Sequence, residues 1–299
     1  MTYSPTKFQF THLLQGVYDK LEQVKSISAT SGTTATVVDT TLTTDYQDFS
    51  DFDGTVAIIA TDAAGLGAAP EGEYALVTNY TASTKTLTFA TSSFTAAVAA
   101  GDIVLLAQGS LFPFQDVKRK CNTALRNLGD IPLLDTTLTT AANQTEYNMP
   151  TAVPWNRIIK IDIQGTTADA DDNRYFETPI NAIVVPPTVG GTALIVLDQL
   201  SSGYEIRITY LTQHPKLVDY DDDIEKAIHP ALAVAACALE CASINRQAAI
   251  QQGLLDKLQA EFALELRRHP MTKLIPTVRG LPHWSSGSNV DPGIPDPIS

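Results

Sequence analysis

Apolar residues change their spacing several times along this chain, and those changes limit the folds that it can adopt. Near the N-terminus, Phe8, Leu13 and Val17 recur close to the period of an α-helix, which predicts an amphipathic helix over residues 5–24. From residue 26 the pattern changes to short β-branched runs separated by turn residues. These runs predict strands at residues 36–38, 55–60, 74–78, 85–89 and 103–107. A small all-β domain is therefore expected directly after the first helix.

Helical spacing returns after this domain. Phe114, Val117 and Cys121 fall on one face and Gly129 supplies a stop signal, which predicts a helix over residues 111–128. Strand-like runs follow at residues 145–148, 157–164, 174–184, 192–197 and 204–210. The last of these alternates apolar and polar residues, which indicates a strand with one buried face.

The C-terminal third predicts a pair of helices. Residues 219–223 are expected to open a long helical region, with a short first turn or a kink at Pro230, because proline removes a helical hydrogen bond. A turn at residues 242–246 would divide this region into a helical hairpin. The second helix carries a narrow apolar seam made of Leu255, Leu258, Phe262 and Leu266.

The expected fold class is α+β. A helical core, made of the N-terminal helix, the central helix and the C-terminal helical hairpin, is combined with an antiparallel β-region. The predicted domains are this core at residues 1–25 and 109–269, an inserted all-β module at 26–108, and an extended C-terminal arm at 270–299.

The arm is predicted from its prolines and its apolar residues. Proline fixes φ and disfavours helix before itself, so the segment after His269 should be extended. Its prolines are Pro270, Pro276, Pro282, Pro292, Pro295 and Pro297. The alternative is a disordered tail, but a purely solvated tail has little reason to carry a set of apolar residues. The basic residues of this stretch are also unusual in an acidic chain. The expected partner-binding residues are Arg267, Arg268, Lys273, Leu274, Ile275, Val278, Arg279, Leu281 and Trp284.

Composition narrows the possible functions. Only 18% of the residues are charged, which gives a smooth surface suited to packing against neighbours, and the net charge of -13 argues against a protein that neutralises phosphates. Cys121, Cys237 and Cys241 are expected to be small buried hydrophobes in a reducing compartment. The chain has neither a signal peptide nor an apolar run long enough to span a bilayer, so no membrane association is expected.

No motif predicts catalysis, a cofactor or a metal. The aspartates at 219–223 begin like a calcium loop, but Ile224 and Pro230 stand where glycine and glutamate are needed. Capping of a helix N-terminus explains these carboxylates better. Asp169, Asp171 and Asp172 lie in a predicted hairpin loop, and the five histidines are scattered. We therefore expect a protein that is not an enzyme.

Three stretches together resemble neck proteins of tailed bacteriophages. Residues 112–129 look like the helix that opens the core of head-to-tail adaptor proteins. Residues 204–210, with Pro215, the acidic turn and His229-Pro230, look like the end of that core. The short sequence segments 36–43, 69–73, 84–88 and 99–102 are similar to parts of a small β-module that recurs in phage structural proteins.

The resemblance implies a subunit of a dodecameric ring in the virion neck, assembled in the host cytoplasm. Such a ring sits beneath the portal protein and receives the tail or further neck proteins. The arm would insert against the portal, and DNA would pass through the channel without specific binding. Adaptors of this family often lack a β-module of this size near their N-terminus, so its position in a ring is not implied.

Two other classes of function remain open. In the first, the β-module is a receptor-binding or glycan-binding unit of a tail protein. In the second, the chain is a cation-dependent enzyme that uses the aspartates at 169–172 or at 219–223.

Overall fold

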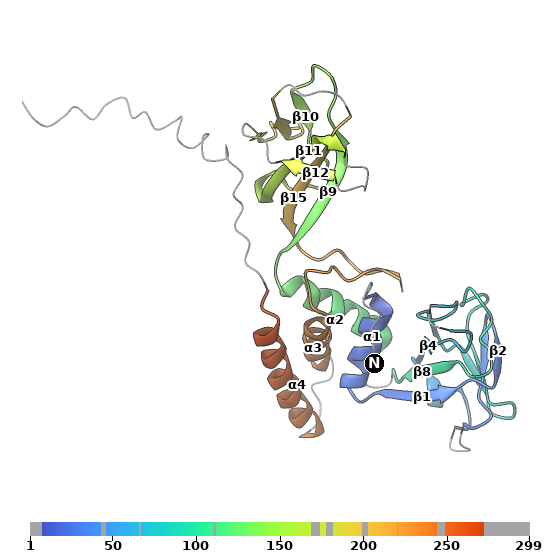
Figure 1. Cartoon of the computed structure of the whole chain (residues 1–299). Helices are drawn as coiled ribbons and strands as arrows, with labels where there is room; N and C mark the ends of the chain where they lie inside the picture. The colour runs from blue at the N-terminus through green and yellow to red at the C-terminus, as the bar shows by residue number, and fades with distance from the viewer. Residues whose placement is uncertain are drawn as a thin grey trace, which may run out of the picture. The chain divides into compact units, whose positions relative to one another are not determined.

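A computed structural model describes residues 8–42, 46–65, 67–109, 112–168, 174–177, 182–198, 203–219, 221–243 and 249–271. These residues form a mixed α+β structure with antiparallel sheets, as predicted (Figure 1). The chain divides into two compact units, one of Met1–Gly129 with His214–Met271 and one containing Asp130–Gln213. The domain scheme predicted from the sequence has different boundaries and stays a prediction.

The first unit contains the four helices of the described residues. They are α1 (Phe10–Lys20), α2 (Phe114–Asn127), α3 (Pro230–Ala242) and α4 (Ala249–Arg268). The other three helices pack against α3, which is rich in alanine and buried along most of its length. Small side chains let neighbouring helices approach closely, so α3 forms the centre of the helical layer.

The start of α3 corrects one prediction. Residues 219–223 do not open a helix, because α3 begins at Pro230 and is capped by His229, whose Nδ1 accepts the Ala231 N–H at 3.3 Å. Proline is favoured at the first helical position and disfavours helix in the residue before it. α3 ends at Ala242, and most of the predicted turn at 242–246 lies outside the described residues.

Strands between α1 and α2 form an all-β region, residues 24–107, which we call the β-module. They are β1 (Val24–Ser28), β2 (Ser31–Thr33), β3 (Thr36–Val38), β4 (Val56–Thr61), β5 (Tyr74–Leu76), β6 (Asn79–Thr81), β7 (Thr86–Thr88) and β8 (Ile103–Ala107), with the 3-10 helix η1 (Phe49–Phe52). They form two antiparallel sheets with strand orders β1-β8-β4-β5 and β2-β3-β7-β6. Each of the five strands predicted here is confirmed, whereas β1, β2 and β6 were not predicted.

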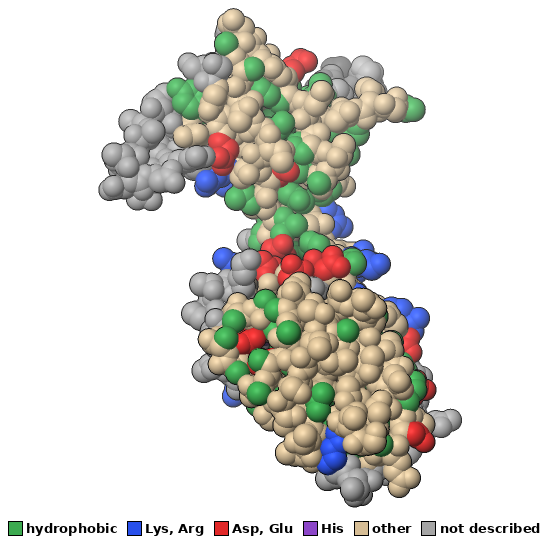
Figure 2. Space-filling view, turned by 90° about the vertical axis from the view of Figure 1, so that its right-hand side faces the viewer, with side chains coloured by type: hydrophobic (Ala, Val, Ile, Leu, Met, Phe, Trp, Pro, Cys, Tyr) green, Lys and Arg blue, Asp and Glu red, His purple; other side chains and the backbone are tan. Residues whose placement is uncertain are grey.

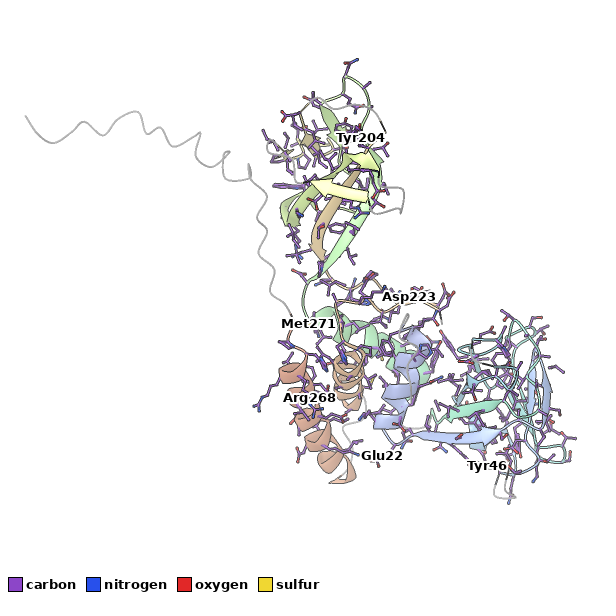
Figure 3. The ribbon with its side chains drawn as sticks, viewed as in Figure 1. Glu22, Tyr46, Tyr204, Asp223, Arg268 and Met271 are labelled. Atoms are coloured by element: carbon purple, nitrogen blue, oxygen red, sulfur yellow. The ribbon has the colours of Figure 1, made fainter. Side chains whose placement is uncertain are left out.

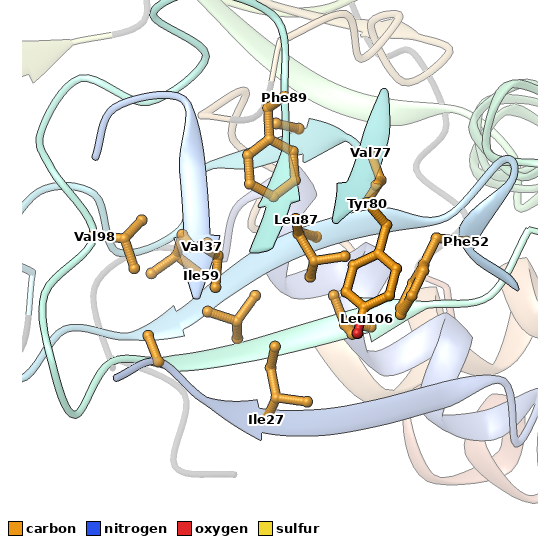
Figure 4. Packing of buried hydrophobic residues seen from close by; sticks show 14 of the residues in the cluster. Ile27, Val37, Phe52, Ile59, Val77, Tyr80, Leu87, Phe89, Val98 and Leu106 are labelled. Carbon is orange, nitrogen blue, oxygen red and sulfur yellow. The ribbon is translucent and has the colours of Figure 1, made fainter. Parts of the chain in front are cut away.

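A continuous hydrophobic core lies between these strands (Figure 4). Leu87, Val37 and Ile59 are fully buried in it, and Phe52 packs on Tyr80 with ring centroids 4.6 Å apart. On β4 and β8 the residues facing the other way are also buried, so the two central strands of this sheet are covered on both faces. Burial on both faces explains why the sequences of residues 55–60 and 103–107 are continuously apolar and do not alternate with polar residues.

Tyr74 of β5 joins the β-module to the helices. Its ring centroid lies 5.0 Å from that of Phe114 and 6.4 Å from that of Phe10, and the Lys118 Nζ lies 3.5 Å from its hydroxyl. Burial raises the pKa of Tyr74, and the nearby carboxylates of Asp219 and Asp222 raise it further. The tyrosine therefore stays protonated and forms an aromatic contact between β5, α1 and α2.

Two buried carboxylates hold loops of the β-module. Asp102 is fully buried, and its carboxylate accepts the Ala63 and Ala99 N–H groups, each at 2.8 Å. Glu73 is 5% exposed and accepts the Thr95 N–H at 2.8 Å. These contacts give Glu73 and Asp102 a structural role in the segments 69–73 and 99–102, because a buried carboxylate needs hydrogen-bond donors.

The second unit consists of strands. They are β9 (Ile131–Thr139), β10 (Glu146–Asn148), β11 (Ile158–Ala168), β12 (Arg174–Glu177), β13 (Ile183–Val185), β14 (Leu194–Val196) and β15 (Glu205–Thr212), with the 3-10 helix η2 (Trp155–Arg157). The strand orders are β12-β11-β15-β9 and β10-β14-β13. The predicted alternation in β15 is confirmed, since Ile206, Ile208 and Tyr210 are buried. The predicted strand at 174–184 is wrong in part, because β12 and β13 lie in different sheets.

Candidate docking site at the end of the last helix

The last turn of α4 is built around a buried carboxylate. Glu265 is only 7% exposed, and its Oε1 accepts a hydrogen bond from the Arg268 Nη1 at 2.9 Å. Its Oε2 lies 3.6 Å from the His269 Nε2, and the His269 N–H donates to the Glu265 carbonyl at 2.8 Å. A buried carboxylate requires such partners, so Glu265 holds Arg268 and His269 in place.

This turn is also tied to the start of α3. The rings of His229 and His269 stack with their centroids 3.4 Å apart and an interplanar angle of 5°. Burial lowers the pKa of His229, and the neighbouring His269 lowers it further, against the opposite effect of Glu265. The end of α4 is therefore fixed by contacts within its own turn and with the N-cap of α3.

The arm residues predicted from the sequence begin at this turn. Arg267 and Arg268 are exposed on α4, and Met271 is the last described residue (Figure 3). Lys273, Leu274, Ile275, Val278, Arg279, Leu281 and Trp284 lie outside the described residues. The structure therefore places only the two arginines of the predicted docking set.

The seam of α4 corrects a second prediction. Leu258 is buried and Leu255 and Phe262 are half-buried, but Leu266 is 39% exposed. Glu265 takes the inward position instead, because it is seven residues after Leu258 and so lies on nearly the same helix face. The sequence carried a signal that was missed: Glu265 and His269 are four residues apart, the spacing at which helical side chains meet.

The aspartates at 219–223 lie beside α1 and not at the start of their own helix. The Phe10 N–H donates to the Asp222 carbonyl at 2.8 Å, and the Gln9 Nε2 donates to the Asp221 carbonyl at 3.2 Å. The Asp222 carboxylate accepts the Asp219 N–H at 2.9 Å. The predicted capping of a following helix is therefore wrong. Asp169, Asp171 and Asp172 lie outside the described residues.

Burial of the three cysteines is confirmed. Cys121, Cys237 and Cys241 are free thiols in the interface of α2 with α3, and the Cys237 Sγ lies 3.6 Å from the Cys121 carbonyl oxygen. The pKa of Cys121 is raised by its contact with the Cys237 thiol and by burial, and burial raises that of Cys237. Protonated buried thiols are poor nucleophiles and poor metal ligands.

From the burial of His214 we predict that the protein loses stability at mildly acidic pH. Its Nε2 accepts the Glu225 N–H at 3.1 Å, and its Nδ1 lies 2.7 Å from the Pro215 carbonyl. Burial lowers its pKa from 6.5, so the unfolded chain binds the proton more readily. The free energy of unfolding should be fully retained above the unfolded pKa and should fall as the pH drops below it. Urea unfolding between pH 8 and pH 5 measures this, and an imidazole that titrates above its ordinary pKa in an NMR experiment would contradict it.

Comparison with known proteins adds no relatives. No protein family model matches the chain, and no curated protein shows significant similarity to it. Across the described ranges, no group of three or more His, Cys, Asp and Glu side chains is arranged to hold a metal ion. In the same part of the chain, no helix is long and apolar enough to cross a membrane.

Proposed function

We propose that this chain is a structural virion protein of a tailed bacteriophage, a ring-forming adaptor that docks under the portal and connects it to the tail. In this proposal the protein acts by assembly and not by catalysis, and DNA passes through the ring without specific binding. In this proposal the adaptor core comprises residues 1–25 and 109–269, an inserted all-β domain comprises residues 26–108, and residues 270–299 are the docking arm.

The end of α4 is the observation that supports docking most directly. Glu265 and the His229 stack hold this turn, while Arg267 and Arg268 remain exposed directly before the proline-rich segment. A docking segment that starts from a fixed point loses less conformational entropy on binding. Exposed arginines at that point also favour an acidic or hydrogen-bonding partner surface.

The β-module and its surface are compatible with the same proposal. β1 follows α1, β8 precedes α2, and the two strands pair antiparallel. The face of the β-module in Figure 2 carries few charged side chains and consists mostly of tan atoms, which are backbone and uncharged polar groups. Such a surface suits broad contacts with neighbouring subunits.

Deletion of residues 270–299 tests the proposal. We expect the truncated chain to remain folded, because the contacts that hold the end of α4 lie at or before His269, and to lose attachment to the portal by at least about tenfold in affinity. Co-sedimentation with purified portal rings measures attachment, and circular dichroism measures folding.

A matched variant separates charge from chain length in this test. Exchange of Arg267 for glutamate should weaken attachment, whereas Lys226→Glu changes the charge by the same amount at another exposed position and should not. Attachment that survives the deletion unchanged would count decisively against the docking arm. Binding of the full chain to a glycan array, together with unaltered attachment, would favour the tail-associated binding module instead.

A further inference from the structure

Two histidines form the contact between the start of α3 and the end of α4. Their rings are nearly parallel, at 5°, and their centroids lie 3.4 Å apart. His229 is exposed and the side chain of His269 is 32% exposed, so protons from the solvent reach both rings. Two imidazolium cations at this distance repel each other. The stack therefore favours a pair of rings that carries at most one positive charge.

The N-cap of α3 requires the neutral form of His229. Its Nδ1 accepts the Ala231 N–H at 3.3 Å, and a protonated Nδ1 is a donor that cannot accept this hydrogen bond. A positive charge at the N-terminus of a helix also opposes the helix dipole. Protonation of His229 therefore removes the cap and places an unfavourable charge beside the first turn of α3.

The surroundings of the two rings are unequal. A protonated His269 forms an ion pair with the buried carboxylate of Glu265, whose Oε2 lies 3.6 Å from its Nε2 and whose Oε1 is bound by Arg268. Burial lowers the pKa of His229, and His269 lowers it further, whereas Glu265 raises it. The nearest ionisable residue on its own segment is Lys226, another cation. A proton on His269 is therefore compensated, and a second proton on His229 is not.

We propose that His229 and His269 form an acid-sensitive latch, which holds the end of α4 against the start of α3 and opens when both rings are protonated. Separation of the rings relieves their repulsion, so the open state binds the proton on His229 more readily than the closed state does. The closed state should therefore be fully favoured above the ordinary histidine pKa of 6.5 and should be lost progressively as the pH falls below it.

The latch lies at the base of the proposed docking arm. Arg267 and Arg268 precede His269 directly, and the proline-rich segment follows it. When the latch opens, the last turn of α4 is no longer held against α3, so a segment that docks from this turn loses more conformational entropy on binding. Acid should therefore weaken attachment, a consequence that rests on the proposed function. The latch itself is a property of the chain alone.

Hydrogen exchange of the full chain at pH 7 and pH 5 tests the latch. The last turn of α4 contains the His269 N–H, which donates to the Glu265 carbonyl at 2.8 Å. After correction for the intrinsic pH dependence of exchange, protection of this turn should fall by about tenfold at pH 5. The helix α2 lies outside the latch and should keep its protection. Mass spectrometry of peptides from the two helices measures both.

Two asparagine variants give a matched comparison. His229→Asn keeps a side chain that can accept the Ala231 N–H but does not titrate, so the end of α4 should have the same protection at both pH values. His12→Asn makes the same exchange at the start of α1, where the His12 Nδ1 accepts the Gln9 N–H at 3.2 Å. This control should leave the response of α4 to acid unchanged.

The possible outcomes separate the latch from the docking function. Unchanged protection of the α4 turn at pH 5 would overturn the latch, and so would an acid response that persists in His229→Asn. An equal loss of protection in α2 would also overturn it, because that result indicates general destabilisation, as expected from His214. None of these measurements involves the portal. Attachment that survives deletion of the arm would contradict the docking function and leave the latch in place.

Discussion

Replacement of Gly109 by alanine is expected to destabilise the first unit by about 2 kcal/mol or more, because the new methyl group has no room. A Cβ at this position would come well inside 3.0 Å of the carbonyl of Gly54, a distance that real Cβ atoms do not show. The atoms that would clash belong to the Gly54 backbone, which cannot swing away as the end of a side chain can. Urea unfolding followed by fluorescence and circular dichroism measures the loss.

The same substitution at Gly253 is the matched control. Gly253 lies in α4, and a Cβ there meets nothing within 4 Å. Alanine favours helix over glycine by roughly 1 kcal/mol, so Gly253→Ala should leave stability unchanged or raise it. Equal effects at the two positions would show that the Gly54 contact does not limit residue 109.

Asp102→Ala is expected to cost about 2 kcal/mol, since it removes the carboxylate that accepts both the Ala63 and the Ala99 N–H groups and so holds their two loops together. Asp102 is fully buried, so water does not take its place without opening the loops. Asp102→Asn keeps one acceptor oxygen and should be intermediate. Equilibrium unfolding in urea measures the cost.

Asp48→Ala provides the comparison, because Asp48 accepts the Ser50 N–H at the same distance of 2.8 Å but is exposed. Water can solvate that N–H after the substitution, so the loss should be much smaller. If the two alanine variants unfold at the same urea concentration, burial is not what makes Asp102 important.

Helices and strands whose apolar residues recur with a clear period were predicted from the sequence. Strands that form mainly because a neighbouring strand pairs with them were missed. The strands at 36–38 and 103–107 agree with β3 and β8 residue for residue. β9 was missed because Pro132 and exposed threonines interrupt its pattern. It forms the edge of its sheet, where proline is tolerated and where only β15 specifies the pairing.

The candidate site was predictable only in part, for a related reason. The exposed arginines at 267 and 268 follow from the sequence, since a basic helix end is a local feature. The rings of His229 and His269 stack although the two residues are forty positions apart in the sequence. A contact over that separation cannot be predicted from a local sequence pattern. A pocket lined by α2 residues and by Lys216 was missed likewise, because hydrogen bonds between distant residues hold Lys216 beside α2. These bonds join Leu217 with Asn122 and the Val218 carbonyl with Lys118.

The pairing of β1 with β8 bears on how such a chain could evolve. Val24 and Ala107, where the polypeptide enters and leaves the β-module, are register partners, so their Cα atoms lie about 5 Å apart. A turn of two or three residues spans that gap, so excision of the whole module would leave α1 and α2 connectable without displacing either helix. Recombination could therefore add, exchange or remove this part as a cassette while the helical layer kept its geometry.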